Sequence, residues 1–172
     1  MQKYGTILLS VAASLLAVST PMALADAGHG KADTFGRLEQ DHHVSRTIEV
    51  RMGEMFFEPS NIDVKPGETV RFVVINEGEA VHEFNLGTEE SWESHVAEME
   101  RMMEEGMIDY DRIYHAKMQK MGMMHSDPNA ALLEPGESAE IIWEFPKDGT
   151  EVGVACNVPG HREAGMVGEI NF

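Results

Sequence analysis

The chain has 172 residues, of which 30 are Asp or Glu and 13 are Lys or Arg, giving a formal net charge of −17. This acidity argues against a nucleic-acid partner, because phosphate backbones repel so negative a chain. The single cysteine excludes an internal disulfide and any zinc or iron–sulfur site that needs several cysteines from this chain. The apolar share of 42% is enough for a hydrophobic core, and the length suits one domain with an insertion.

The first 25 residues carry the pattern of a secretory signal peptide. Lys3 precedes an apolar run from Ile7 to Val18, and Ala23-Leu24-Ala25 fits a small-x-small cleavage site. The run is shorter than the roughly 20 residues of a spanning helix, and no later apolar stretch is long enough. We therefore expect cleavage near Ala25, a periplasmic protein without a membrane span, and an extended N-terminal arm over residues 26–43.

Short β-type segments separated by turn signals follow the arm. Pro66-Gly67 and Pro135-Gly136 are the clearest turns, and β-branched residues dominate several of the segments between them. We expect strands over residues 44–52, 62–64, 70–75, 80–86, 139–145, 151–155 and 167–172.

Residues 87–132 differ from their surroundings, because helix formers replace the β-branched residues. We expect one helix over 91–105, capped by Ser91 and ended by Gly106, and a second over 109–121. The sequence thus predicts an all-β sandwich domain over residues 44–172, interrupted by a helical insertion over residues 87–132.

Three candidate metal ligands share one loop near the C-terminus, with the spacing Cys156-x4-His161-x4-Met166. The turn at Pro159-Gly160 lets the loop fold back so that the three side chains meet. A thiolate, imidazoles and a weak thioether are the donors of a mononuclear redox copper site. His82, at the end of an upstream apolar strand, is the candidate for the second imidazole. Each residue alone is more often structural, but their combined arrangement indicates copper.

On these residues, segments 57–86 and 149–172 resemble the cupredoxins, the small blue-copper proteins. The four-residue gaps are more similar to the rusticyanin and auracyanin branch than to plastocyanin, and the whole layout is similar to periplasmic copper-tolerance cupredoxins of Gram-negative bacteria. The resemblance implies a Greek-key β-sandwich in which His82, Cys156 and His161 are equatorial copper ligands and Met166 is the axial one. Glu83 departs from the family, which often carries Asn there, so the hydrogen bonding around the Cys156 sulfur is expected to differ.

The insertion is rich in methionine and histidine, with eight Met between Met99 and Met124. Clustered thioethers and imidazoles select Cu(I), because soft donors suit a soft ion. The alternative is that these Met pack the helices onto the sandwich, although no Leu shares that task between Trp92 and Met124. Candidates for a second Cu(I) site are His95, Met99, Met102, Met103, Met107, His115, Met118, Met121, Met123, Met124 and His125.

These features predict a periplasmic type 1 copper protein of copper tolerance, with one type 1 copper and additional Cu(I) collected by the insertion. The alternative is an electron shuttle between a cytochrome and a terminal oxidase or reductase, and a third interpretation is a non-redox copper store. Four filled donor positions leave no open position for a substrate, so the sequence does not predict an enzyme. The expected partner is a redox or copper-exchange protein. The sequence identifies neither this partner nor the oligomeric state.

Overall fold

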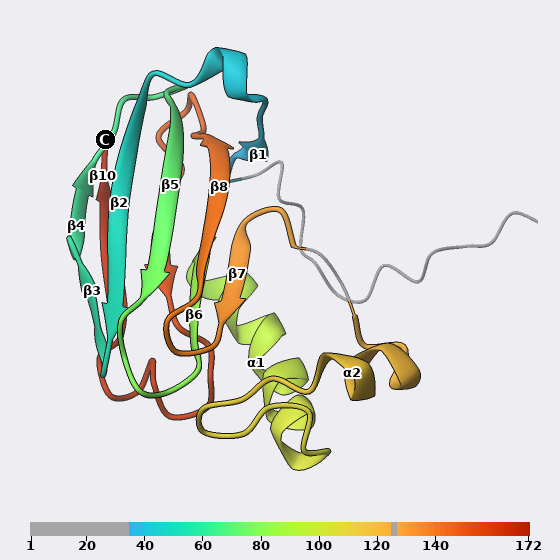
Figure 1. The fold of residues 1–172 in the computed structure, drawn as a ribbon. Helices are drawn as coiled ribbons and strands as arrows, with labels where there is room; N and C mark the ends of the chain where they lie inside the picture. The colour runs from blue at the N-terminus through green and yellow to red at the C-terminus, as the bar shows by residue number, and fades with distance from the viewer. Residues whose placement is uncertain (1–34, 125–126) are drawn as a thin grey trace, which may run out of the picture.

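The structure is a computed structural model that describes residues 35–124 and 127–172 (Figure 1). The predicted signal peptide and the first half of the predicted N-terminal arm, residues 26–34, lie outside these residues. The helices are α1 (Glu89–Glu104) and α2 (His115–Met121), and a short 3-10 turn covers Asp41–His43. The strands are β1 (Arg37–Leu38), β2 (Arg46–Gly53), β3 (Phe56–Glu58), β4 (Asn61–Asp63), β5 (Thr69–Asn76), β6 (His82–Gly87), β7 (Ala130–Leu133), β8 (Ser138–Glu144), β9 (Gly153–Ala155) and β10 (Val167–Asn171).

The strands of the described residues form two five-stranded sheets that pack against each other (Figure 1). One sheet has the order β1-β8-β5-β2-β3, and the other has the order β4-β10-β9-β6-β7. β2 pairs with β5 and β4 pairs with β10 in parallel, whereas the other pairings are antiparallel. The arrangement confirms the predicted all-β sandwich with a helical insertion.

Alternating burial along the strands creates the core between the sheets. In β5 the side chains of Val70, Phe72 and Val74 are fully buried, because every second residue of a strand points to the same face. The ring of Phe72 lies 5.4 Å from that of Phe84 on β6, which joins the two sheets. Each such fully buried side chain stabilises the fold by about 1.5–3 kcal/mol, so the core holds both sheets rigidly.

The insertion differs from its prediction in three places. Thr88, not Ser91, is the N-cap of α1: its hydroxyl accepts from the Ser91 backbone at 3.3 Å, and the Ser91 hydroxyl accepts from the Thr88 backbone at 2.9 Å. The second helix begins at His115 rather than at 109, because Ile108 and Ile113 pair as a β-bridge before it. The last residues of the predicted insertion belong to the sandwich, where β7 pairs with β6.

Both helices lie beside β6 and β7 at one end of the sandwich (Figure 1). Trp92 of α1 packs against Gly153 of β9, where an added Cβ would lie 2.8 Å from the indole ring. Neither helix of the described ranges is long and apolar enough to cross a bilayer. The insertion is therefore docked on the sheet that carries His82.

Candidate metal centre

His82, Cys156 and His161 meet at one point in the fold. Nδ1 of His161 lies 3.2 Å from Nδ1 of His82 and 3.3 Å from Sγ of Cys156. One ligand-type atom from each of the three residues lies within 4.8 Å of the others. His82 and Cys156 are fully buried, whereas His161 is partly exposed. The structure thus brings together three of the four predicted ligands.

Backbone hydrogen bonds close the loop that carries Cys156, His161 and Met166. Cys156 follows β9 directly, and its N–H donates to the Met166 carbonyl at 3.1 Å. The Met166 N–H in turn donates to the His161 carbonyl at 3.0 Å. Gly160 and Gly165 adopt φ values of 88° and 97°, which favour glycine, so the chain reverses twice within the loop. Met166 is fully buried, and its backbone is bonded to both other residues of the loop.

A buried amide fixes the turn that leads to His82. The side-chain nitrogen of Asn76 donates to the Ala80 carbonyl at 2.8 Å and to the Leu133 carbonyl at 2.9 Å. Its side-chain oxygen accepts from the Gly78 N–H at 3.0 Å. Because β6 pairs His82 with Leu133, Asn76 ties together the two strands and the turn beside His82. Sequence reasoning did not identify this residue, and the only signal was a polar residue ending an apolar strand.

The protonation states suit a metal cation. Burial lowers the pKa of His82 and of His161, and in His82 the neighbouring His161 lowers it further, so both imidazoles are neutral donors at neutral pH. Burial also raises the pKa of the Cys156 thiol to about 12, although the Glu83 backbone N–H donates to its sulfur at 3.3 Å. A bound metal replaces the thiol proton, because the metal binds the thiolate.

The donors and their surroundings fit copper. The two Nδ1 atoms face each other beside the sulfur, so a cation between them satisfies all three groups at once. Among the residues that the structure describes, Nε2 of His82 is buried without a hydrogen-bond partner, and the Glu54 carboxylate, 3.8 Å away, is beyond hydrogen-bond distance. One thiolate with two imidazoles, in a buried site on a rigid scaffold, is the donor set of a type 1 copper centre.

Glu83, the residue that departs from the cupredoxin pattern, joins the insertion to the loop of residues 156–166, which we call the copper loop. Its side chain is buried, and Oε2 accepts from the backbone of Asn157 at 3.2 Å and from the Asn157 side chain at 2.8 Å. Oε1 lies 3.0 Å from Nε2 of His95 on α1. The sequence marked Glu83 as unusual but did not identify Asn157 or His95 as its partners. A carboxylate within the apolar run of β6 was the available signal.

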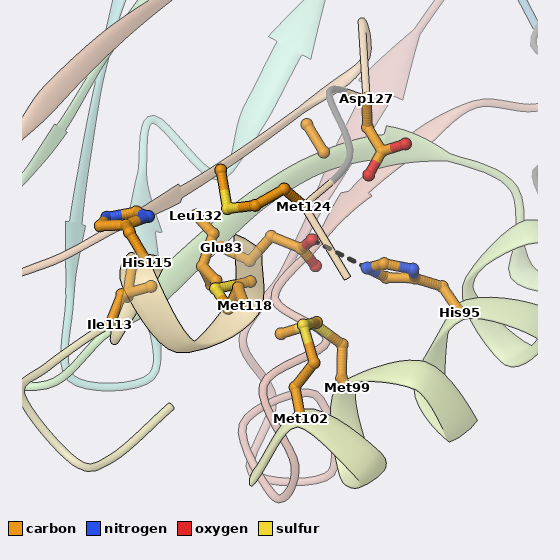
Figure 2. A pocket seen from close by; sticks show the side chains of 11 residues that line it. Glu83, His95, Met99, Met102, Ile113, His115, Met118, Met124, Asp127 and Leu132 are labelled. Atoms are coloured by element: carbon orange, nitrogen blue, oxygen red, sulfur yellow. Dashed lines mark hydrogen bonds and ion pairs between the residues drawn. The ribbon is translucent and has the colours of Figure 1, made fainter. Parts of the chain in front are cut away.

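A cavity of about 220 Å³ lies between the insertion and the sheet, on the side of Glu83 that faces His95 (Figure 2). Figure 2 shows Met99 and Met102 of α1 and Met118 of α2 pointing into this space. Its lining residues are Glu83, His95, Met99, Met102, Ile113, His115, Met118, Met124, Asp127, Ala130 and Leu132.

The cavity divides the candidates for a second copper site into two groups. Six of them line it: His95, Met99, Met102, His115, Met118 and Met124. Met107 and Met123 are buried in the hydrophobic core but do not line the cavity, and Met103 and Met121 are exposed. His125 lies outside the described residues.

Comparisons with known proteins agree with this geometry. The family of copper binding proteins related to plastocyanin and azurin matches residues 44–172. The chain is 46% identical over 159 residues to the copper-resistant cuproprotein CopI of Pseudomonas aeruginosa, and the match covers 86% of each chain. It is 40% identical over 161 residues to the CopI protein of Rubrivivax gelatinosus, again over 86% of each chain. The structure of auracyanin B is similar in fold, with 19% identity, a TM-score of 0.55 and coverage of 80% of this chain and 95% of that one.

Proposed function

Because the chain belongs to the plastocyanin/azurin family of copper-binding proteins, we propose that it is a copper-tolerance protein with one type 1 copper site. His82, Cys156 and His161 are the equatorial ligands in this proposal, and Met166 is the axial one. The observation that carries it is the convergence of two imidazole nitrogens and one thiol within 4.8 Å. The two CopI relatives, named as copper-resistant cuproproteins, support tolerance as the biological role.

Bound copper supplies reversible one-electron chemistry between Cu(II) and Cu(I). The protein's part is to hold the donors in a fixed geometry: the Asn76 contacts fix the turn before His82, and the Met166 backbone closes the loop. Burial of Cys156 keeps water from the sulfur, and the Glu83 N–H donates to it. With four donor positions filled, the site binds no substrate, and we propose a non-enzymatic role.

The pattern over residues 1–25 supports export to the periplasm. A redox or copper-exchange protein is the proposed partner. His161 is the ligand that reaches the surface, so the partner docks over its exposed edge.

The test is a visible spectrum of the purified protein after addition of Cu(II), measured on the wild type and on Cys156→Ser. An intense thiolate-to-copper band in the wild type and its loss in the variant are expected. The same two genes are then returned to a copper-sensitive deletion strain. Rescue by the wild type but not by Cys156→Ser supports tolerance through this site, whereas equal rescue contradicts it. An electron shuttle instead predicts no copper phenotype and fast, salt-dependent electron exchange with a basic partner.

A further inference from the structure

The buried ring of His82 has one nitrogen that the copper ligands do not contact. Its Nδ1 faces Nδ1 of His161 at 3.2 Å, so Nε2 lies on the other side of the ring. Within residues 35–124 and 127–172, this Nε2 is buried and has no hydrogen-bond partner. A neutral imidazole carries one proton and one free lone pair, so a metal on Nδ1 leaves the proton on Nε2. The site therefore contains a buried N–H donor that needs an acceptor.

The carboxylate of Glu54 lies beside this nitrogen. Its Oε1 is 3.8 Å from Nε2 of His82, which exceeds the range of a hydrogen bond by less than about 1 Å. The His82 side chain is fully buried, whereas the Glu54 side chain is 49% exposed. The carboxylate thus stands between the buried ring and solvent, and its exposed half leaves room for the small shift that would close the gap.

The backbone holds the Glu54 carboxylate at this position. Glu54 follows β2 directly, in the turn to β3, and its Oε1 accepts from the backbone N–H of Glu79 and from that of Ala80 at 3.3 Å. The hydrogen bond from Glu79 lowers the pKa of Glu54, so the carboxylate is ionised at neutral pH. One oxygen atom therefore joins the turn after β2 to the turn that leads into His82.

A glycine gives the carboxylate and the imidazole access to each other. A Cβ on Gly78 would lie 2.6 Å from Oε1 of Glu54 and 2.9 Å from Nε2 of His82. The backbone at Gly78 is fixed there, because its N–H donates to the Asn76 side chain at 3.0 Å. Any other residue at this position would push a methyl group against both atoms. The turn of residues 76–80 is therefore built so that Glu54 and His82 face each other.

We propose that Glu54 is a positioning residue of the type 1 site, which accepts a hydrogen bond from the Nε2–H of His82 when Nδ1 of that ring binds copper. Such a contact fixes the tautomer and the orientation of a ligand imidazole and makes it a stronger donor. The negative charge favours Cu(II) over Cu(I), because its attraction grows with the charge of the ion. The inference rests on the proposed type 1 site and adds to it a residue outside the four ligands.

The first test compares the reduction potentials of Glu54→Gln and Glu79→Gln by voltammetry. Gln at position 54 keeps an oxygen for both backbone N–H groups, so the turn stays closed, but it removes the charge. Glu79→Gln removes a charge from an exposed side chain of the same turn and keeps the N–H that donates to Glu54.

We expect Glu54→Gln to lose about 10–100-fold in Cu(II) affinity, with a smaller loss for Cu(I). Each tenfold loss specific to Cu(II) raises the reduction potential by about 59 mV. Glu79→Gln should keep the potential of the wild type. A role confined to holding the turn predicts no change in Glu54→Gln, so equal potentials in the two variants overturn the proposal.

The second test detects the hydrogen bond itself, by NMR of the diamagnetic Cu(I) protein with 15N-labelled histidine and backbone. The proton on Nε2 of His82 should exchange slowly with water in the wild type and faster in Glu54→Asp, whose carboxylate keeps its charge but is too short to reach the ring. The Val81 N–H, which donates to the Tyr110 carbonyl at 2.7 Å, reports opening of the same segment. Equally slow exchange of the His82 proton in both proteins overturns the hydrogen bond, as does faster exchange of both N–H groups together.

The two proposals fail separately. A wild-type protein without a thiolate-to-copper band contradicts the type 1 site whatever Glu54 does. A normal band, together with a Glu54→Gln potential equal to that of Glu79→Gln, contradicts the role of Glu54 alone.

Discussion

Oε1 of Glu83 lies 3.0 Å from Nε2 of His95, and the other oxygen of this carboxylate accepts two hydrogen bonds from Asn157. One side chain thus connects β6, helix α1 and Asn157, the residue that follows Cys156. Because all three groups are buried, these hydrogen bonds are not weakened by competing water. The position of the insertion is therefore coupled to the geometry of the copper loop.

Glu83→Gln should alter the copper site while the fold persists. Gln keeps the size and the acceptor oxygen but removes a negative charge next to the Cys156 thiolate, and that charge favours Cu(II) over Cu(I). We expect the reduction potential to rise by roughly 60 mV, which is about 1.4 kcal/mol for one electron. The measurements are voltammetry and the position of the thiolate-to-copper band.

Glu98→Gln is the matched control for this change, because Glu98 also neighbours His95, with its carboxylate 3.5 Å from Nδ1, the ring nitrogen that Glu83 does not contact. Its reduction potential should equal that of the wild type. A Glu83→Gln potential equal to that of Glu98→Gln would contradict a link between the carboxylate and the copper site.

His95 should make the stability of the metal-free protein depend on pH. Burial lowers the pKa of His95, but the hydrogen bond to Glu83 and the charges of Glu83, Asp127 and Glu98 outweigh it and raise the pKa to about 9. The pKa of His95 in the folded protein is above the ordinary value of 6.5, so the protonated ring stabilises the fold. This stabilisation is fully present below pH 6.5 and is lost as the pH rises through 9. The free energy of unfolding should fall by up to about 3 kcal/mol across this window.

Urea unfolding between pH 6 and pH 9 measures this dependence, in a Cys156→Ser background so that the thiol does not titrate. His95→Gln can still donate to Glu83 but carries no proton that titrates, so its stability should stay nearly level. A slope that survives in His95→Gln would assign the effect to other groups.

Docking of α1 depends on a glycine in β9. A Cβ on Gly153 would lie 2.8 Å from Cη2 of Trp92 and 3.1 Å from the Gly168 carbonyl, so Gly153→Ala pushes the indole away. We expect a loss of about 1–3 kcal/mol in the free energy of unfolding, as for other overpacked sites. Thermal and urea unfolding measure it.

A double variant identifies the contact responsible. Trp92→Leu removes the ring that meets the new methyl group, so Gly153→Ala with Trp92→Leu should lose less than the sum of the two single losses, by at least about 0.5 kcal/mol. Strict additivity would place the strain at the Gly168 carbonyl instead.

The sequence predicted the long strands because their β-branched residues alternate between core and solvent, as in β5. It missed β1, β3 and β7, which have two, three and four residues. Segments this short have no measurable periodicity, and β7 reads Ala-Ala-Leu-Leu, a pattern that suits a helix equally well. Their strand conformation comes from pairing with a neighbour, such as β6 for β7, which is a tertiary effect.

The ligand loop could be predicted because its residues are close in sequence and their spacing carries the chemistry. The contacts of Glu83 could not, because its partners His95 and Asn157 are 12 and 74 residues away and meet it only after α1 has docked. Helical spacing places His95, Met99 and Met102 on one face of α1, but spacing alone does not tell which face meets a cavity. Met103 was also among the candidates, and the structure leaves that side chain exposed.

Asn76 should be essential for both stability and copper binding. Asn76→Ala leaves the buried carbonyls of Ala80 and Leu133 without this donor and the Gly78 N–H without its acceptor. Unpaired buried groups of this kind cost about 1–3 kcal/mol each, so the two buried carbonyls together give an expected loss of roughly 2–6 kcal/mol. Because the freed turn leads directly to His82, Cu(II) affinity should also fall, by about 10–100-fold, as for other groups that support a ligand.

Asn61→Ala on β4, an exposed position, is the matched control and should change stability by no more than about 0.5 kcal/mol. A normal Cu(II) affinity in a destabilised Asn76→Ala protein would show that the turn before His82 does not position the imidazole.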